Sequence, residues 1–138
     1  RRYSSAASDV YKRQINKPWV MTDWQFKATT HDIHEIDFNG HTYETLRSNG
    51  TARELFDSPD TIINTSCEHI ENWSDWWSKI PAGKMCVLQS NDYKELPEHI
   101  NCVNDVDHFK SIAPMQTYLF GGKLDLDKYT RYMIIGIK

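Results

Sequence analysis

The stretch PDTIINTSCEHI, residues 59–70, decides the fold that this sequence predicts. Thr61–Thr65 is short and β-branched, and it follows the chain breakers of residues 58–60, so it predicts a buried strand. Glu68 and His69 come shortly after that strand. Because ligands of open α/β sheets bind beyond the carboxyl ends of the strands, we expect a functional site at this edge.

The residues that follow predict a helix with one aromatic face. Within residues 70–80, apolar side chains recur at positions i, i+3, i+4 and i+7, namely at Trp73, Trp76, Trp77 and Ile80. Asn72 is placed to cap this helix, and Asp75 lies in its first turn. Such a stripe is typical of a helix that faces a core, and an aromatic stacking platform is the alternative.

Strands and helices continue to alternate toward the C-terminus. Met85–Leu88 is a continuous apolar run, as expected of a parallel strand that is covered on both faces. A helix is predicted to start at Asn104-Asp105 and to stop at Pro114. The strands predicted over 115–120 and 129–137 have a connection too short for a typical helical crossover, so we expect an antiparallel hairpin.

The N-terminal half of the chain is less regular. Bulky and polar side chains alternate over residues 24–30, which predicts a strand that ends before His31-Asp32. Residues 33–38 predict a turn or a short helix, and residues 41–47 fit either a short strand or a helical turn. The alternation of strands and helices along the chain predicts an α/β fold with a C-terminal hairpin.

Composition and charge exclude several classes of protein. With 39% hydrophobic and 25% charged residues, the chain is typical of a globular domain. No apolar run approaches the roughly 20 residues that span a membrane. Residues 1–14 hold four basic residues and one acid, so the remainder, with 12 basic and 18 acidic residues, disfavours a broad nucleic-acid-binding face. The odd cysteine count without a CxxC predicts reduced, buried thiols in a cytoplasm, at Cys67, Cys86 and Cys102.

The first fourteen residues, RRYSSAASDVYKRQ, differ from the rest of the chain. They have no apolar period, and they resemble the translation of sequencing-adapter read-through at the ends of environmental assemblies. On this interpretation the native sequence begins near Ile15 and its N-terminal part is missing. An ordinary disordered basic arm is the alternative. In both cases residues 15–138 are the domain to interpret.

The PDTIINTSCEHI block, together with Asp32 after the first predicted strand, resembles class I S-adenosylmethionine-dependent methyltransferases. That family has a seven-stranded sheet of order 3-2-1-4-5-7-6, in which only strand 7 is antiparallel. Residues 61–65 resemble strand 4, residues 80–89 resemble the turn and strand 5, and residues 129–136 resemble strand 7. The blocks CEHI and LQSNDY are similar to those of small methyltransferase-like proteins of marine phages and bacteria.

The resemblance implies a partial Rossmann-like methyltransferase sheet with strands 3, 4, 5, 6 and 7 of seven, and S-adenosylmethionine as the cofactor. The family's glycine-rich loop after strand 1 and its acid after strand 2 have no counterpart, because the sequence holds no GxGxG and Gly121-Gly122 lies in the late hairpin. We therefore expect methyl transfer to an unidentified acceptor by a full-length parent. We expect this chain alone to be inactive and to bind the cofactor poorly or not at all.

The resemblance also implies cofactor contacts at two strand ends. Asp32 matches the acid after strand 3 that accepts a hydrogen bond from the adenine amino group, and Ile33 would add an apolar and backbone contact. Asn64 and Thr65 end strand 4, where backbone carbonyls face the amino group and the sulfonium of the cofactor. The alternatives are a turn or capping acid for Asp32 and ordinary strand-end polarity for Asn64 and Thr65.

Methyl transfer from a sulfonium mainly needs positioning of two reactants and, for some acceptors, removal of a proton. Glu68 and His69 are the candidate catalytic residues, since His69 could act as a base near neutral pH. A structural role for this pair is the alternative. Ser90 and Asn91, after strand 5, are candidates for binding the acceptor, and a plain polar turn is the alternative.

Two interpretations from other classes stay open. A non-catalytic interaction module could keep the scaffold without the chemistry. A metal-dependent hydrolase could bind zinc through members of a scattered set of ligands, but no CxxC or HxxxH spacing joins them, so the sequence predicts no metal site. That set is His31, His34, Cys67, His69, His99 and Cys102.

Overall fold

The structure is a computed structural model that describes residues 31–46 and 50–138. The chain divides into two units, Arg1–Asp57 and Ser58–Lys138, and each is described by itself. The leader over residues 1–14 and the strand predicted over residues 24–30 lie outside the described residues. The described part is mixed α/β, with a four-stranded mixed sheet and a separate antiparallel pair of strands.

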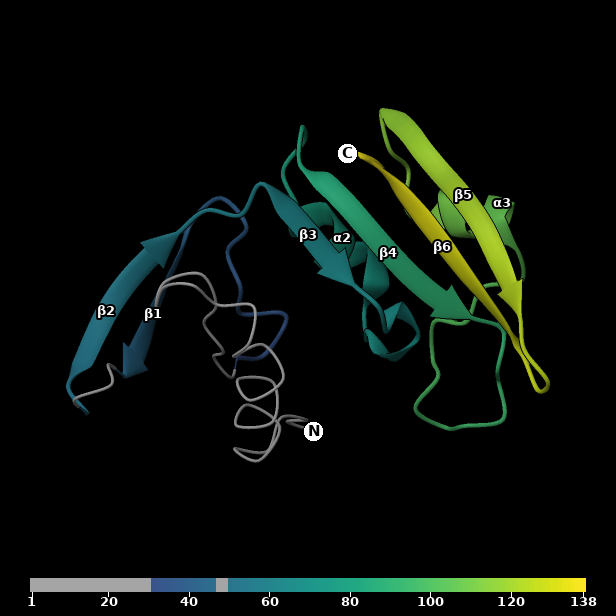
Figure 1. Cartoon of the computed structure of the whole chain (residues 1–138), viewed down its shortest axis with the longest axis horizontal. Helices are drawn as coiled ribbons and strands as arrows, with labels where there is room; N and C mark the ends of the chain where they lie inside the picture. The colour runs from purple at the N-terminus through teal and green to yellow at the C-terminus, as the bar shows by residue number, and fades with distance from the viewer. Residues whose placement is uncertain (1–30, 47–49) are drawn as a thin grey trace, which may run out of the picture. The chain divides into compact units, whose positions relative to one another are not determined.

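The first unit contains an antiparallel pair of strands, β1 (His41–Leu46) and β2 (Ala52–Asp57), as Figure 1 shows. For residues 41–46 the structure therefore decides between the two alternatives in favour of a strand. β2 was not predicted. Most of its side chains are exposed, so the sequence offers no alternation of apolar and polar residues that would have indicated a strand.

The second unit is built on the four-stranded sheet, with strand order β3-β4-β6-β5 (Figure 1). β3 and β4 are parallel, whereas β6 runs antiparallel to both β4 and β5. The prediction of a C-terminal antiparallel hairpin is thus confirmed. The strands are β3 (Thr61–Asn64), β4 (Met85–Asn91), β5 (Thr117–Asp125) and β6 (Thr130–Ile137).

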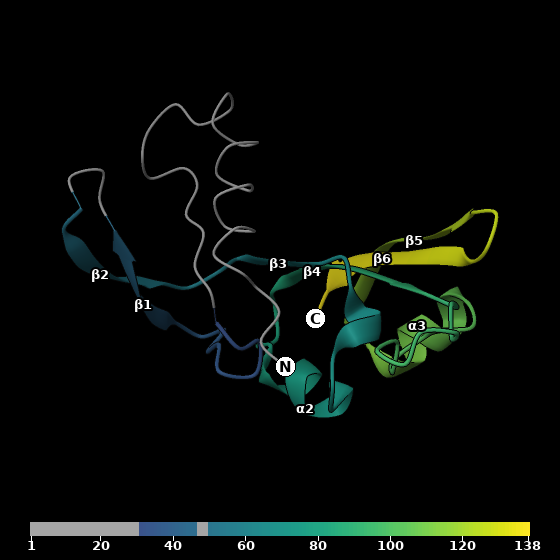
Figure 2. The same ribbon diagram turned by 90° about the horizontal axis from the view of Figure 1, so that it is seen from below.

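Two short helices, α2 (Trp73–Lys79) and α3 (Val106–Ile112), lie on the same face of this sheet (Figure 2). A 3-10 turn, η2 (Cys67–His69), follows β3. The aromatic stripe of α2 is core, as the sequence favoured, because Trp73, Trp76 and Trp77 are all buried. The Trp73 indole also donates a hydrogen bond of 2.6 Å to the carbonyl of Ile112, which ties α2 to the end of α3.

The two helices begin differently. α3 begins where the sequence predicted, directly after Asn104-Asp105. Asp105 caps it, since its side chain accepts a hydrogen bond of 2.6 Å from the backbone N–H of His108. Asn72 holds the N-cap position of α2 but makes no side-chain capping bond, because its backbone is left-handed, with φ at 47°. Asn72 thus holds the cap position that the sequence predicted, but without the side-chain hydrogen bond expected of a cap. Asparagine is one of the few residue types that tolerate this conformation.

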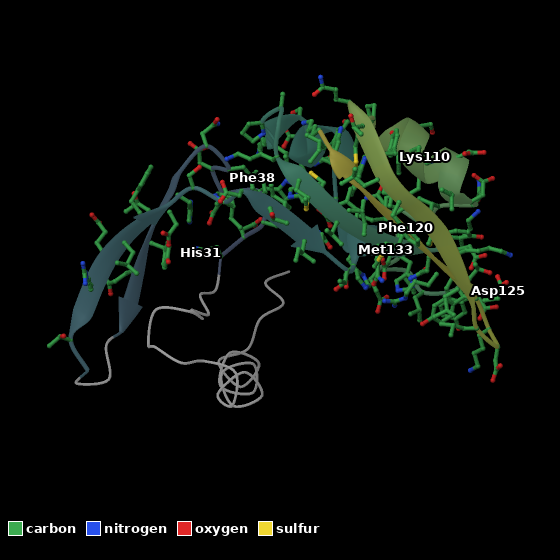
Figure 3. All side chains as sticks on the ribbon, turned by 45° about the horizontal axis from the view of Figure 1, so that its top comes forward. His31, Phe38, Lys110, Phe120, Asp125 and Met133 are labelled. Atoms are coloured by element: carbon green, nitrogen blue, oxygen red, sulfur yellow. The ribbon has the colours of Figure 1, made fainter. Side chains whose placement is uncertain are left out.

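The opposite face of the sheet carries a row of apolar side chains. Ile63, Val87, Ile135 and Phe120 stand opposite one another across β3, β4, β6 and β5. Ile63 is 66% exposed and Phe120 49%, and Figure 3 shows Phe120 and Met133 on this face. Within the described residues, helices cover only the other face, so the prediction that residues 85–88 are covered on both faces is not met there.

Two further predictions concern the state of the cysteines and the absence of a membrane-spanning segment. Cys67 and Cys86 are free and buried, as predicted, and Cys102 is free and half-buried. In the described part of the chain, no helix combines the length and the apolar character that crossing a bilayer requires.

Candidate functional site

The candidate site lies at the carboxyl ends of β3 and β4. Because the two strands are parallel, with Asn64 opposite Leu88, their carboxyl ends meet at one edge of the sheet. η2 leaves β3 at this edge, and residues 92–104 connect β4 to α3 there. The edge therefore collects the polar residues that the sequence places after each strand.

Glu68 is the most unusual residue of this edge. Its side chain is buried, at 3% exposure for the residue, and its Oε2 atom has no hydrogen-bond partner in the described part of the chain. Its Oε1 atom lies 4.0 Å from Nε2 of His69, which is too long for a hydrogen bond. A buried carboxylate oxygen left unsatisfied costs more than the about 1–3 kcal/mol typical of a neutral group, so a bound cation or ligand would stabilise this geometry.

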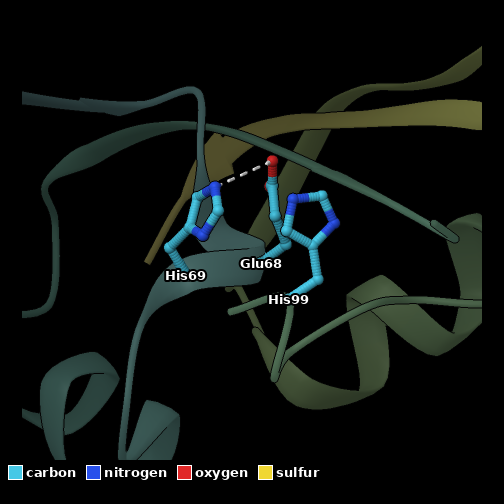
Figure 4. Close-up of side chains that lie close together, drawn as sticks. All are labelled: Glu68, His69 and His99. Carbon is cyan, nitrogen blue, oxygen red and sulfur yellow. Dashed lines mark ion pairs between the residues drawn. The ribbon is translucent and has the colours of Figure 1, made fainter. Parts of the chain in front are cut away.

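His69 and His99 complete a cluster with Glu68 (Figure 4). Their rings meet edge to face, with centroids 4.7 Å apart. Nδ1 of His69 lies 3.1 Å from the carbonyl of Glu98, and Nδ1 of His99 lies 2.7 Å from the carbonyl of Tyr93. Since a carbonyl only accepts, both Nδ1 atoms carry the proton, and in the neutral rings both Nε2 atoms keep a lone pair.

The loop of residues 92–104 is held onto this edge by the candidate substrate-binding residues. Ser90 and Asn91 are buried, at 1% and 2% exposure. The Ser90 hydroxyl donates to the Asn101 carbonyl at 3.1 Å, and the Asn91 carbonyl accepts from the N–H of Val103 at 2.9 Å. Both residues are therefore engaged in positioning the loop, and their role in binding an acceptor stays a prediction.

The candidate cofactor residues lie in both units. Asn64 is half-buried, and its Oδ1 accepts from the N–H of Ser66 at 2.9 Å, while Thr65 is exposed. Asp32 belongs to the first unit, is exposed, and accepts from the N–H of His34 at 2.9 Å. Ile33 beside it is half-buried. Asp32 thus makes the turn contact that its alternative interpretation describes, and its role in binding a cofactor stays a prediction.

The thiols of Cys67 and Cys102, which lie at this edge, have low reactivity. Burial, and secondly the negative charge of Glu68, raise the pKa of the Cys67 thiol far above its ordinary value. The same two causes, in the same order, raise the pKa of Cys102. Both therefore stay protonated near neutral pH, which makes them poor nucleophiles and poor metal ligands.

The sequence did not predict His99 as part of this site. It named His99 only as one of the possible ligands of the zinc alternative. A signal was present, because the tripeptide Glu-His-Ile occurs at residues 68–70 and again at 98–100. The structure brings the two copies together through two hydrogen bonds, Asn101 N–H to the Glu68 carbonyl at 3.0 Å and His69 Nδ1 to the Glu98 carbonyl. The spacing alone did not predict this contact, since it depends on how residues 92–104 fold back.

The chain matches no family model, no curated protein and no solved structure. Family membership is therefore not shown. The topology of the sheet and the residues at its carboxyl edge carry the functional argument.

Proposed function

We propose that this chain is the C-terminal part of a class I S-adenosylmethionine-dependent methyltransferase, whose full-length parent methylates an unidentified acceptor. The observation that carries the proposal is the strand order β3-β4-β6-β5, with β6 alone antiparallel to the other strands. The C-terminal half of the family sheet has the order 4-5-7-6 with strand 7 alone antiparallel. β3, β4, β5 and β6 then correspond to strands 4, 5, 6 and 7.

The connections between the strands support the same correspondence. α2 joins the parallel strands β3 and β4, α3 joins β4 to β5, and a tight hairpin joins β5 to β6. A sheet of this topology binds its ligand beyond the carboxyl ends of the parallel strands, where the polar cluster lies.

The residues of this chain fit part of the cofactor. The exposed carboxylate of Asp32 can accept a further hydrogen bond from an adenine amino group, with Ile33 beside it, and Asn64 and Thr65 lie at the end of the proposed strand 4. The sequence has no glycine-rich loop to hold the methionine part, so the parent supplies that half in this proposal. When bound, S-adenosylmethionine supplies an activated methyl group.

Proton removal from the acceptor falls to Glu68 and His69 in this proposal. The His69 side chain is 44% exposed and keeps a lone pair on Nε2 when neutral, so it can reach an acceptor and take its proton. Glu68 lies beside it and stabilises the imidazolium that results. Ser90 and Asn91 position the loop of residues 92–104 next to the place where the acceptor would bind. The proposed location of the protein is the cytoplasm.

A non-catalytic interaction module on the same scaffold is the second candidate. The apolar row that includes Ile63 and Phe120 favours it, because large exposed apolar patches often mark binding surfaces. The two candidates differ in cofactor binding, since an interaction module needs none.

Titration with S-adenosylhomocysteine tests the proposal. The gene that contains residues 15–138 is recovered from overlapping reads with its upstream codons, and the parent is compared with the 138-residue chain by calorimetry. We expect saturable one-to-one binding by the parent. We expect binding at least about 100-fold weaker by the short chain, since each hydrogen bond to a charged group contributes about 1.5–3 kcal/mol. A parent without a glycine-rich loop and without measurable binding would favour the interaction module.

A further inference from the structure

We propose that Glu68, His69 and His99 form a binding site for a divalent transition-metal ion of the zinc type. The three side chains each offer one ligand atom, and these atoms all lie within 4.8 Å of one another (Figure 4). Two histidines and one glutamate are an established ligand set for zinc that leaves a fourth position open. The ion binds here without any cofactor, so the inference is tested apart from the proposed methyl transfer. A bound ion would occupy Nε2 of His69, so His69 could serve as the base only in the metal-free protein.

The unsatisfied oxygen of Glu68 is the first reason for this assignment. Oε2 is buried and has no hydrogen-bond partner among the described residues, and Oε1 faces Nε2 of His69 across 4.0 Å. Two ligand atoms bonded to a tetrahedral zinc ion at about 2.1 Å lie about 3.4 Å apart. The observed separation is thus too long for direct contact and close to the distance that one bound ion would bridge.

The orientation of the two imidazoles is the second reason. Nδ1 of each ring is bonded to a backbone carbonyl, at 3.1 Å for His69 and 2.7 Å for His99. Histidines that bind metals commonly donate their other ring N–H to a carbonyl or a carboxylate, which fixes the tautomer and turns the remaining nitrogen toward the ion. In this orientation the Nε2 atoms of both rings are left to bind the ion together with a Glu68 oxygen.

The site would also connect two distant segments of the chain. Glu68 and His69 belong to η2, whereas His99 belongs to the loop between β4 and α3. A bound ion therefore pins residues 92–104 against the end of β3. We expect zinc to raise the melting temperature of the folded protein, because a ligand that binds the native state stabilises it.

The test uses the full 138-residue chain, freed of any affinity tag and of metal. Zn²⁺ is titrated against a chromophoric chelator, and Co²⁺ is used as a spectroscopic probe. We expect one Zn²⁺ per chain and the visible absorption of four-coordinate Co²⁺. We also expect bound Zn²⁺ to protect His69 and His99, but not His31 or His34, from acylation by diethyl pyrocarbonate. These three measurements use the unaltered chain, so none depends on a variant that fails to fold.

Three variants remove one ligand atom each and keep the local hydrogen bonds. In His69→Asn and His99→Asn the amide can still donate to the carbonyl that Nδ1 contacts, and Glu68→Gln keeps the shape of the side chain. We expect each change to weaken Zn²⁺ binding by more than about 100-fold, since even the outer-shell partners of a metal contribute about 10–100-fold. His31→Asn and His34→Asn are the matched controls, and we expect them to leave the affinity unchanged.

Tryptophan fluorescence and the melting temperature are measured for each variant and for the unaltered chain without metal. We expect each variant to give the same values as the unaltered chain, which would show that it is folded. The inference fails if the unaltered chain binds no stoichiometric Zn²⁺, or if His31→Asn and His34→Asn weaken binding as much as His99→Asn. Neither result bears on cofactor binding, which the S-adenosylhomocysteine titration of the parent tests separately.

Discussion

Gly136 shows how closely one residue constrains this sheet. It lies on β6, which is hydrogen-bonded to strands on both sides. A Cβ atom built there would lie 2.3 Å from the backbone carbonyl of Thr117 and 2.6 Å from Sδ of Met115. The backbone of β5 cannot give way without losing its register with β6, so only glycine fits.

We predict that Gly136→Ala destabilises the protein by about 2 kcal/mol or more, because overpacking a close backbone contact typically costs about 1–3 kcal/mol. The measurement is urea unfolding. Gly121→Ala is the control, since its Cβ would meet only side-chain atoms, the nearest at 3.0 Å on Val106. Equal losses for the two variants would contradict this account of the β5–β6 contact.

At the scale of elements, the β1–β2 hairpin carries a titratable contact. The Tyr43 hydroxyl donates a hydrogen bond to the carboxylate of Asp57 on the facing strand. This bond, and secondly partial burial, raise the pKa of Tyr43 to about 12 from its ordinary value of 10.0. The folded hairpin therefore favours the protonated phenol. Its contribution to stability is fully present below pH 10 and is lost as the pH rises through about 12.

We predict that one tyrosine titrates near pH 12, and that Tyr43→Phe removes that step from the ultraviolet absorbance titration. Asp57→Asn should move the step back toward the ordinary value, because the charged acceptor is gone. A difference titration between the unaltered chain and Tyr43→Phe with its midpoint near pH 10 would show that the contact is not formed.

At the scale of the whole molecule, local patterns predicted the elements of the second unit. The β-branched run of residues 61–65 predicted β3, and the aromatic stripe predicted α2. The short connection between the last two strands predicted the hairpin. β2 escaped because its side chains are mostly exposed, so no alternation marks it. In this chain, therefore, a strand or helix could be predicted from the sequence where it packs on a core, because only then do its apolar residues recur with a regular period.

The candidate site was predictable only in part. The positions of Glu68 and Asn91 at the carboxyl edge follow from where their strands end. The meeting of Glu68 with His99, and the loop contacts of Ser90 and Asn91, depend on the path of residues 92–104, which no periodicity encodes. The distinction between a polar turn and a site thus arises from tertiary structure.

In the proposed methyltransferase, Asp32 is predicted to bind the adenine of the cofactor in the parent protein. Asp32 and Asp37 make similar local contacts, since each accepts a hydrogen bond of 2.9 Å from the backbone N–H two residues on. Asp37→Asn is therefore a matched control for Asp32→Asn. Both changes remove one negative charge and keep an oxygen that can accept the local bond.

The most direct measurement is the affinity of the parent and of these two variants for S-adenosylhomocysteine. We predict that Asp32→Asn weakens binding by about 10-fold or more, the loss expected for a hydrogen bond to a charged group, and that Asp37→Asn leaves it unchanged. Equal affinities for the parent and Asp32→Asn would contradict the account.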